Sequence, residues 1–362
     1  MDAVRLHAFG PPENLVLEQV PDPAPGPGQV RVAVRAHGVH LLDTTLRRGE
    51  VAGGPLPLPA LPTVPGREVA GVVDALGPGV DAAWRGRRVA AHLGARPDGG
   101  GYARLAVVPV EALHRVPDHV TAPDAVAMVG TGRTAVGILD LAGIARGDVV
   151  VVTAAAGGLG TLLVQGALAT GARVVGLAGG ARKVDLVRSL GGEAAAGRLA
   201  ALDYRAPGWL DAARDAVGDE GATVLLDGVG GDLGTDAAGL VRDGGRLVLH
   251  GWSSGPANHA AGGDAPARPR AGGDAAASSR ERGDVGHDGP NSGGRAPRHD
   301  VRWAVGPQAG PWGDLSALQE RALALAADGT WRVVTHQVPL AEAARAHREL
   351  EERATTGKVV LV

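Results

Sequence analysis

Cysteine is absent from the whole sequence of 362 residues. Its absence excludes disulfide bonds, thiolate nucleophiles and every zinc site that depends on cysteine ligands. Aromatic residues are also scarce, with one Phe and two Tyr, whereas Gly occurs 58 times. Because glycine is so frequent, a glycine motif in this chain is informative only when its flanking segments also fit.

The sequence has no strong excess of charge and no recognisable targeting segment. Its formal net charge is −3 at pH 7, with acids and bases interspersed, so we expect it to bind neither nucleic acid nor a membrane surface. The start, MDAVRLHAFGPPENL, lacks a basic segment followed by an apolar core, which predicts no signal peptide. No apolar run is expected to reach membrane-spanning length. These features predict a cytoplasmic protein, long enough for two domains.

The first third of the chain has the pattern of short strands separated by turns. Runs rich in β-forming residues are bounded by Gly, Pro or Asp. They span residues 15–20, 30–36, 68–76, 87–92 and 102–108. This spacing predicts a small antiparallel barrel or sandwich.

From about residue 122 the pattern changes to strands that alternate with helices. Helices are predicted at 122–141, 161–170, 181–191, around 234–242, at 314–329 and near the end, and strands at 149–154, 173–178, 222–230, 245–252, 301–306 and the last residues. Such alternation predicts βαβ units and a parallel sheet.

Residues 257–300 interrupt this alternation. They contain no Leu, Ile, Phe, Met, Trp or Tyr and a single Val. Such a segment cannot bury enough apolar surface to offset its ordering entropy. We expect a disordered, low-complexity insert, either a natural flexible segment or an out-of-frame stretch of the gene.

The strongest single motif follows the predicted strand at 149–154. The pattern Ala155-x-Gly157-x-x-Gly160 opens a helix, which is the context that dinucleotide binding requires. Gly157 would let the backbone approach a pyrophosphate, and Gly160 would allow close packing of helix against strand. Amides at the helix N-terminus would hold the phosphates. The turn is formed by Ala155, Ala156, Gly157, Gly158, Leu159 and Gly160.

The end of the next strand predicts which cofactor binds. NAD enzymes place an acidic residue there for the ribose 2′-hydroxyl, but this chain has Gly179 and Gly180, followed by Arg182 and Lys183. Two cations beside small residues favour the 2′-phosphate of NADPH. The alternative is that Arg182 and Lys183 only begin an exposed helix.

Motifs along nearly the whole chain resemble the quinone oxidoreductase branch of the medium-chain dehydrogenase/reductase superfamily. They include AHGVHLLDTTLRRG (36–49), PTVPGREVAGVV (62–73), GGYARLAVVP (100–109), GRTAVGIL (132–139), DYRAP (203–207) and TTGKVVLV (355–362). The resemblance implies a GroES-like catalytic domain, residues 1–126 completed by 312–362. It also implies a Rossmann NADPH-binding domain, residues 127–311, that contains the insert.

The same resemblance implies further contacts. Thr134 and Gly251 would lie near the nicotinamide, Tyr204 with Lys183 near the adenosine phosphate, and Lys358 in the same cleft. Tyr204 as ordinary packing and Lys358 as solvated surface remain the alternatives. The family also pairs two Rossmann sheets at their edges, which implies a homodimer that the insert would weaken.

Catalytic zinc is not expected. Zinc-dependent relatives have Cys at the position of His40 and His at that of Arg67, and arginine stays protonated and cannot be a ligand. His40 with Asp43 would be two ligands, fewer than a stable site needs. His40 either donates a hydrogen bond or proton to a substrate carbonyl or is bonded to Asp43 as scaffold.

The sequence therefore predicts a zinc-free reductase that transfers hydride from NADPH to a quinone or an α,β-unsaturated carbonyl. His40, Thr45 or water would supply the proton. The alternatives are a polyketide-type enoyl-thioester reductase and a non-catalytic NADPH-binding structural or sensor protein.

Overall fold

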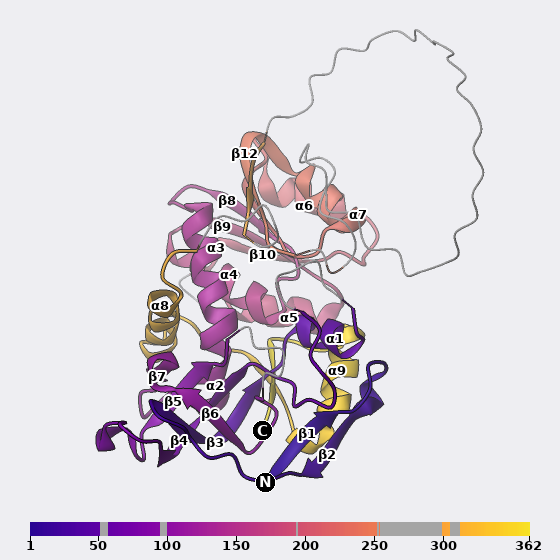
Figure 1. Ribbon diagram of the computed structural model, residues 1–362. Helices are drawn as coiled ribbons and strands as arrows, with labels where there is room; N and C mark the ends of the chain where they lie inside the picture. Colours follow the sequence, from indigo (N-terminus) through magenta and orange to yellow (C-terminus); the bar gives the residue numbers. More distant parts are fainter. Residues whose placement is uncertain (51–56, 95–99, 193–194, 252, 254–298, 305–311) are drawn as a thin grey trace, which may run out of the picture.

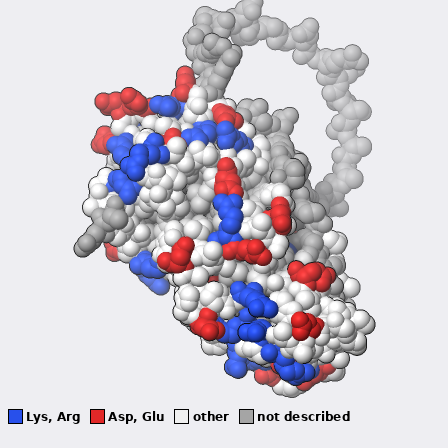
Figure 2. Space-filling view, turned by 90° about the vertical axis from the view of Figure 1, so that its left-hand side faces the viewer, with Lys and Arg blue, Asp and Glu red and all other residues white. Residues whose placement is uncertain are grey.

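The computed structural model describes residues 1–50, 57–94, 100–192, 195–251, 253, 299–304 and 312–362. Two separate sheets form the two halves of the molecule, and both chain termini lie in the lower half (Figure 1). On the face that Figure 2 shows, acidic and basic residues are interspersed over most of the surface.

The lower half is built around β3 (Gln29–Gly38), a strand whose valines point into the core. It pairs antiparallel with β4 (Glu68–Leu76) on one side and with β6 (Leu105–Pro109) and β15 (Lys358–Leu361) on the other. The sheet order is β14-β15-β3-β4-β5-β7. The remaining strands are β5 (Arg88–His92), β7 (Leu113–Arg115) and β14 (Thr335–Val338), and a separate pair consists of β1 (Asp2–Leu6) and β2 (Leu15–Gln19).

The upper half is a six-stranded parallel sheet in the order β10-β9-β8-β11-β12-β13. This is the doubly wound order. The order in which strands are added to the sheet reverses between β8 and β11, and such sheets bind their ligands at that point. The strands are β8 (Val149–Val152), β9 (Arg173–Ala178), β10 (Leu199–Asp203), β11 (Ala222–Asp227), β12 (Val241–Leu249) and β13 (Asp300–Trp303).

Helices cover both faces of this sheet and bury its continuous valine and leucine runs. One core packs the sheet against α3 (Arg133–Ala142), α4 (Gly158–Ala169) and α5 (Ala181–Ser189), and the other against α6 (Trp209–Val217) and α7 (Gly231–Ala238). The lower half carries α1 (Leu41–Arg47), α2 (Ala122–Ala127) and α9 (Ala343–Glu351), and α8 (Leu315–Ala327) packs against α3. The predicted α/β class, with a GroES-like part and a Rossmann sheet, is confirmed.

Several local predictions need correction. The helix expected at 122–141 is two helices, α2 and α3, joined by a π-helical turn at Met128–Gly132. Together they span Ala122–Ala142, which is long and apolar enough to cross a membrane, but 67% of it is buried inside the fold. Helices α1 and α6 and strands β1, β7, β10 and β14 were not predicted. Most of the expected insert 257–300, and residues 305–306 of a predicted strand, lie outside the described residues.

Candidate active site

The predicted phosphate-binding turn joins β8 to α4 at the carboxyl edge of the parallel sheet. Gly157 caps α4, and Ala154 has a φ of +48°, in the left-handed region that non-glycine residues rarely adopt. A Cβ at Gly160 would lie 2.2 Å from the carbonyl oxygen of Ala154, so only glycine fits there. Glycine at this position lets the start of α4 lie directly against the backbone that follows β8.

The same turn touches the lower half of the molecule. The Gly357 amide donates to the Ala156 carbonyl at 2.8 Å, and a Cβ at Gly158 would lie 3.0 Å from the Cα of Lys358. Gly357 itself has a φ of +67°. These contacts hold the start of β15 directly against the glycine-rich turn.

A second glycine site lies at the end of β9. A Cβ at Gly179 would lie 2.7 Å from the hydroxyl of Tyr204 and 2.9 Å from the Nε of Arg205. The Asp203 carboxylate accepts hydrogen bonds from the amides of Gly180 and Arg205, both at 2.9 Å. Tyr204 therefore lies at Gly179, and Arg205 is a neighbour that the sequence analysis missed.

Cations gather around this glycine. Lys183 Nζ donates to the carbonyl oxygen of Arg353 at 2.6 Å. Burial, followed by the charges of Arg205, Arg353 and Arg182, lowers the pKa of Lys183. The four positive charges repel one another, and a phosphate dianion placed among them would reduce that repulsion.

The point where the sheet order reverses is held by a buried carboxylate. Asp227 Oδ1 accepts from the Thr153 hydroxyl at 2.8 Å and from the Val229 amide at 3.0 Å. The Thr153 hydroxyl accepts in turn from the Gly228 amide at 2.9 Å. A Cβ at Gly251 would lie 2.5 Å from the Gly228 carbonyl oxygen. The segments that follow β11 and β12 can therefore approach this closely only because residue 251 is glycine.

The lower half contributes a buried charge cluster, which we call the Glu68 cluster: Glu68, His40 and Lys358. Glu68 is fully buried at the start of β4, His40 precedes α1, and Lys358 begins β15. His40 Nε2 lies 2.6 Å from Glu68 Oε1 and 2.9 Å from Lys358 Nζ, and Lys358 Nζ lies 3.2 Å from Glu68 Oε2. Neither carboxylate oxygen receives a well-aligned hydrogen bond from a described residue, so the contacts are ion pairs.

Glycines make room for this carboxylate. A Cβ at Gly130 would lie 1.4 Å from Glu68 Oε1, and one at Gly38 would lie 2.1 Å from Oε2. Burial alone would raise the pKa of Glu68, but the charges of His40 and Lys358 outweigh it and hold that pKa well below its usual range. Glu68 is therefore a carboxylate at neutral pH, enclosed by cations.

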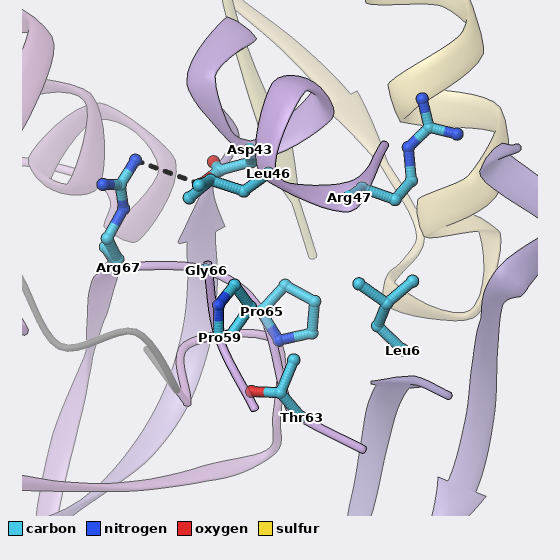
Figure 3. Close-up of a pocket in the computed structure, with 9 residues that line it drawn as sticks. All are labelled: Leu6, Asp43, Leu46, Arg47, Pro59, Thr63, Pro65, Gly66 and Arg67. Carbon is cyan, nitrogen blue, oxygen red and sulfur yellow. Dashed lines mark hydrogen bonds and ion pairs between the residues drawn. The ribbon is translucent and has the colours of Figure 1, made fainter. Parts of the chain in front are cut away.

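A second buried pair lies beside the cluster. Arg67 donates to Asp43 Oδ1 at 3.2 Å (Figure 3). The backbone amide of His40 donates to Asp43 Oδ2 at 2.7 Å. His40 is thus bonded to Asp43 through its backbone amide, as a scaffold role would require, while its ring lies against Glu68. Lys358 as solvated surface is wrong, since its side chain is 6% exposed.

Asp43 and Arg67 also line a small pocket between α1 and residues 59–67 (Figure 3). Its other walls are mostly apolar and include Leu6, Pro59 and Pro65. The Thr63 side chain points into it (Figure 3). An apolar space therefore adjoins the charged cluster.

Two predicted residues lie apart from these contacts. The Thr45 hydroxyl donates to the Leu41 carbonyl within α1, and no hydrogen bond joins it to His40 or Lys358, which are both described. Thr134 is half-buried in the first turn of α3, next to Arg133.

Comparison with known proteins identifies the family to which a chain with this site belongs. Residues 26–118 match the alcohol dehydrogenase GroES-like domain, and residues 196–361 match the zinc-binding dehydrogenase domain. A 2-haloacrylate reductase from Burkholderia sp is 33% identical over 259 residues, which cover 71% of this chain and 74% of the relative. The chain belongs to the medium-chain dehydrogenase/reductase superfamily.

Longer matches agree. A quinone oxidoreductase from Pseudomonas aeruginosa is 29% identical over 99% of this chain and 98% of its own length. A solved structure of a mycobacterial protein complexed with NADPH has a TM-score of 0.75 and 29% identity, and the match covers both chains completely. This member of the superfamily is accordingly an oxidoreductase.

The name of the matched zinc-binding domain raises the question of whether the residues fit a metal. Among the described residues, no three His, Asp or Glu side chains come together. His40 and Glu68 are the only potential ligands that meet here within the part of the chain that is described, and the cations Lys358 and Arg67 lie against them. This donor set does not fit zinc, which needs three or four ligands.

NADPH, by contrast, fits the described residues of this superfamily member. The Gly157–Gly160 turn offers backbone amides, and the cations near Gly179 offer a phosphate site. Of these cations, Arg205 directly follows Tyr204 in sequence and was within reach of the motif analysis. Arg353 is 170 residues from Lys183, and nothing in its local sequence indicated a role.

Proposed function

We propose that this oxidoreductase reduces quinones or α,β-unsaturated carbonyl compounds with NADPH. One observation carries the proposal: the Gly357–Ala156 hydrogen bond holds the glycine-rich turn beside the Glu68 cluster. A pyrophosphate on that turn would direct the nicotinamide toward Thr134 and Gly251. The other residues that the sequence analysis assigned to cofactor or substrate contacts keep those roles in this proposal.

Preference for NADPH over NADH is supported by the residues around Gly179. Position 179 is a glycine, and the neighbouring Asp203 carboxylate is held by the amides of Gly180 and Arg205. Tyr204 supplies a donor, and Arg182, Lys183, Arg205 and Arg353 supply four cations. A 2′-phosphate would form charge-assisted hydrogen bonds there. An NADH ribose hydroxyl would leave the cations unpaired.

When bound, NADPH would supply a hydride from C4 of its nicotinamide to an electrophilic carbon of the substrate. The protein's part is to hold the substrate carbonyl close to the cofactor and to meet the negative charge that forms on its oxygen. His40 is the proposed donor, because its side chain is 28% exposed while Glu68 and Lys358 fix its Nε2 edge. Thr45 and water are the other proton sources in this proposal.

Zinc plays no part in the proposed reaction. The ammonium group of Lys358 and an N–H group of His40 would stabilise the developing oxyanion instead of a Lewis-acidic metal. The division into a catalytic part (1–126 with 312–362) and a cofactor part (127–311), a cytoplasmic location and a homodimer through the edge strand β13 belong to the same proposal.

The direct test is NADPH oxidation by the full chain in the presence of an ortho-quinone or a simple enone. We expect turnover that prefers NADPH to NADH and is unchanged by a chelator. Activity lost on chelation and restored by zinc would overturn the zinc-free mechanism. Turnover only with enoyl thioesters would favour the polyketide-type reductase, and tight NADPH binding without turnover would favour a structural or sensor role.

A further inference from the structure

One cation at the substrate end has no ion-pair partner among the described residues. Lys358 is paired with Glu68, and Arg67 is paired with Asp43. Arg133 forms no hydrogen bond or ion pair with any residue in the described part of the chain, although it is only half exposed. Three basic side chains (Lys358, Arg67 and Arg133) thus share this region with two carboxylates, Glu68 and Asp43.

The position of Arg133 ties it to the same cluster. It begins α3, directly after the π-helical turn whose Gly130 lies against the Glu68 carboxylate. The charge of Glu68 acts on Arg133, and the charge of Arg133 acts on His92, the residue that pairs with Glu68 across β4 and β5. Arg133 is also the immediate neighbour of Thr134, which would lie near the nicotinamide in the proposed function.

A guanidinium in such surroundings is a strong binding group for one chemical class. Partial burial lowers the pKa of Arg133, so the charged form is incompletely solvated there. Arginine presents a planar fork of donors that matches both oxygens of a carboxylate. An anionic group would supply the counter-ion that no described residue provides.

We propose that Arg133 binds a carboxylate on the substrate, so that the preferred acceptors are unsaturated acids with a conjugated carbonyl. This inference rests on the proposed function, since it concerns the substrate of the same site. Arg133 is thereby the residue that determines specificity, and the Glu68 cluster serves the reacting carbonyl.

A matched pair of acceptors tests the assignment: 4-oxo-2-pentenoate and its methyl ester, which share the alkene and the ketone. Replacing the arginine (Arg133→Met) should raise KM for the acid on the order of 10- to 100-fold, the range for a lost hydrogen bond to a charged group. The kcat for the acid and both constants for the ester should change little. Arg133→Lys should restore part of the affinity for the acid.

The controls separate this assignment from a cofactor role. Arg214→Gln removes an arginine from an exposed pair on α6 and should leave all constants unchanged. Equal losses for acid and ester, or a matching loss of NADPH affinity, would overturn the assignment to a substrate carboxylate.

A binding measurement covers the case without turnover. Calorimetry with 4-oxopentanoate and its methyl ester, on protein loaded with NADP⁺, should show binding of the acid that Arg133→Met abolishes. If the protein reduces neither acceptor but shows this binding, the proposed function fails and the Arg133 site stands. If the acid binds no better than the ester, the Arg133 site fails whatever the turnover.

Discussion

The two ends of the proposed cofactor site are built in different ways. At the phosphate end, the backbone does most of the work: Gly157 and Gly160 shape a turn, and a helix start offers its amides. At the substrate end, side chains do it: Glu68, His40 and Lys358 meet from three elements that are far apart in the sequence. The first end is fixed by sterics and the second by charge.

This difference decides which changes each end tolerates. A backbone turn accepts many side chains as long as no Cβ enters the space it encloses. A buried charge cluster accepts almost no single change, because removing one member leaves the others uncompensated in a medium of low polarity. The two ends should therefore respond differently to substitution, acid and cofactor.

The largest effect is expected when the cluster loses its carboxylate. The substitution Glu68→Gln should destabilise the fold by about 3–5 kcal/mol, because Lys358 would remain buried with its countercharge removed. Urea unfolding followed by circular dichroism measures this loss. The double variant Glu68→Gln with Lys358→Met should recover part of it.

The exposed Glu13, which pairs with Arg348 at the surface, provides the matched control. Glu13→Gln should change stability little, since exposed ion pairs contribute little. A Glu68→Gln protein as stable as the parent would mean that charge does not hold the substrate end together.

Acid should destabilise the fold through its buried histidines. Burial lowers the pKa of His37 and of His347 from 6.5 to about 4. Because the fold disfavours their protonated forms, their contribution to stability is complete above pH 6.5 and declines as the pH falls toward 4. The loss is on the order of 3 kcal/mol for each histidine.

Unfolding free energies measured between pH 7 and 4 test this dependence. His37→Gln should flatten the decline, whereas His119→Gln, at an exposed position, should leave it unchanged. An identical decline in all three proteins would mean that His37 does not carry the acid sensitivity.

At the phosphate end, two glycines in one turn should behave differently. Gly160→Ala forces a Cβ to within 2.2 Å of a backbone oxygen, so we expect a loss of stability of about 1–3 kcal/mol. Gly157 has a φ of −78°, and its nearest neighbour would be 3.2 Å from the new Cβ. Gly157→Ala should therefore fold normally and weaken NADPH binding instead.

Thermal unfolding and fluorescence titration with NADPH separate these outcomes. If both variants lose the same stability, or if Gly157→Ala binds NADPH as tightly as the parent protein does, the two glycines do not have the separate roles proposed for them.

What the sequence predicts follows the same division. The turn at Gly157–Gly160 lies in one short segment, so its spacing alone indicated its geometry and the Rossmann sheet around it. The Glu68 cluster depends on β4, β15 and the start of α1 meeting in space, and no local pattern encodes such contacts. The short helix α1 was missed because Leu41–Arg47 has too few residues for a helical period to be recognised.

The smallest effect concerns cofactor choice, the one place where side chains act at the phosphate end. Arg205→Gln should lower NADPH affinity on the order of 10-fold, at the weaker end for a hydrogen bond to a charged group, because Arg205 is exposed. NADH affinity should stay the same, since NADH brings no phosphate to this position. The substitution also removes a charge that lowers the pKa of Lys183, so that Lys183 holds its proton more firmly and offsets part of the loss. Titrations with both cofactors measure the ratio, with Arg188→Gln on the exposed face of α5 as control. Equal losses for NADPH and NADH would mean that Arg205 shapes the turn at Gly179 and does not bind the phosphate.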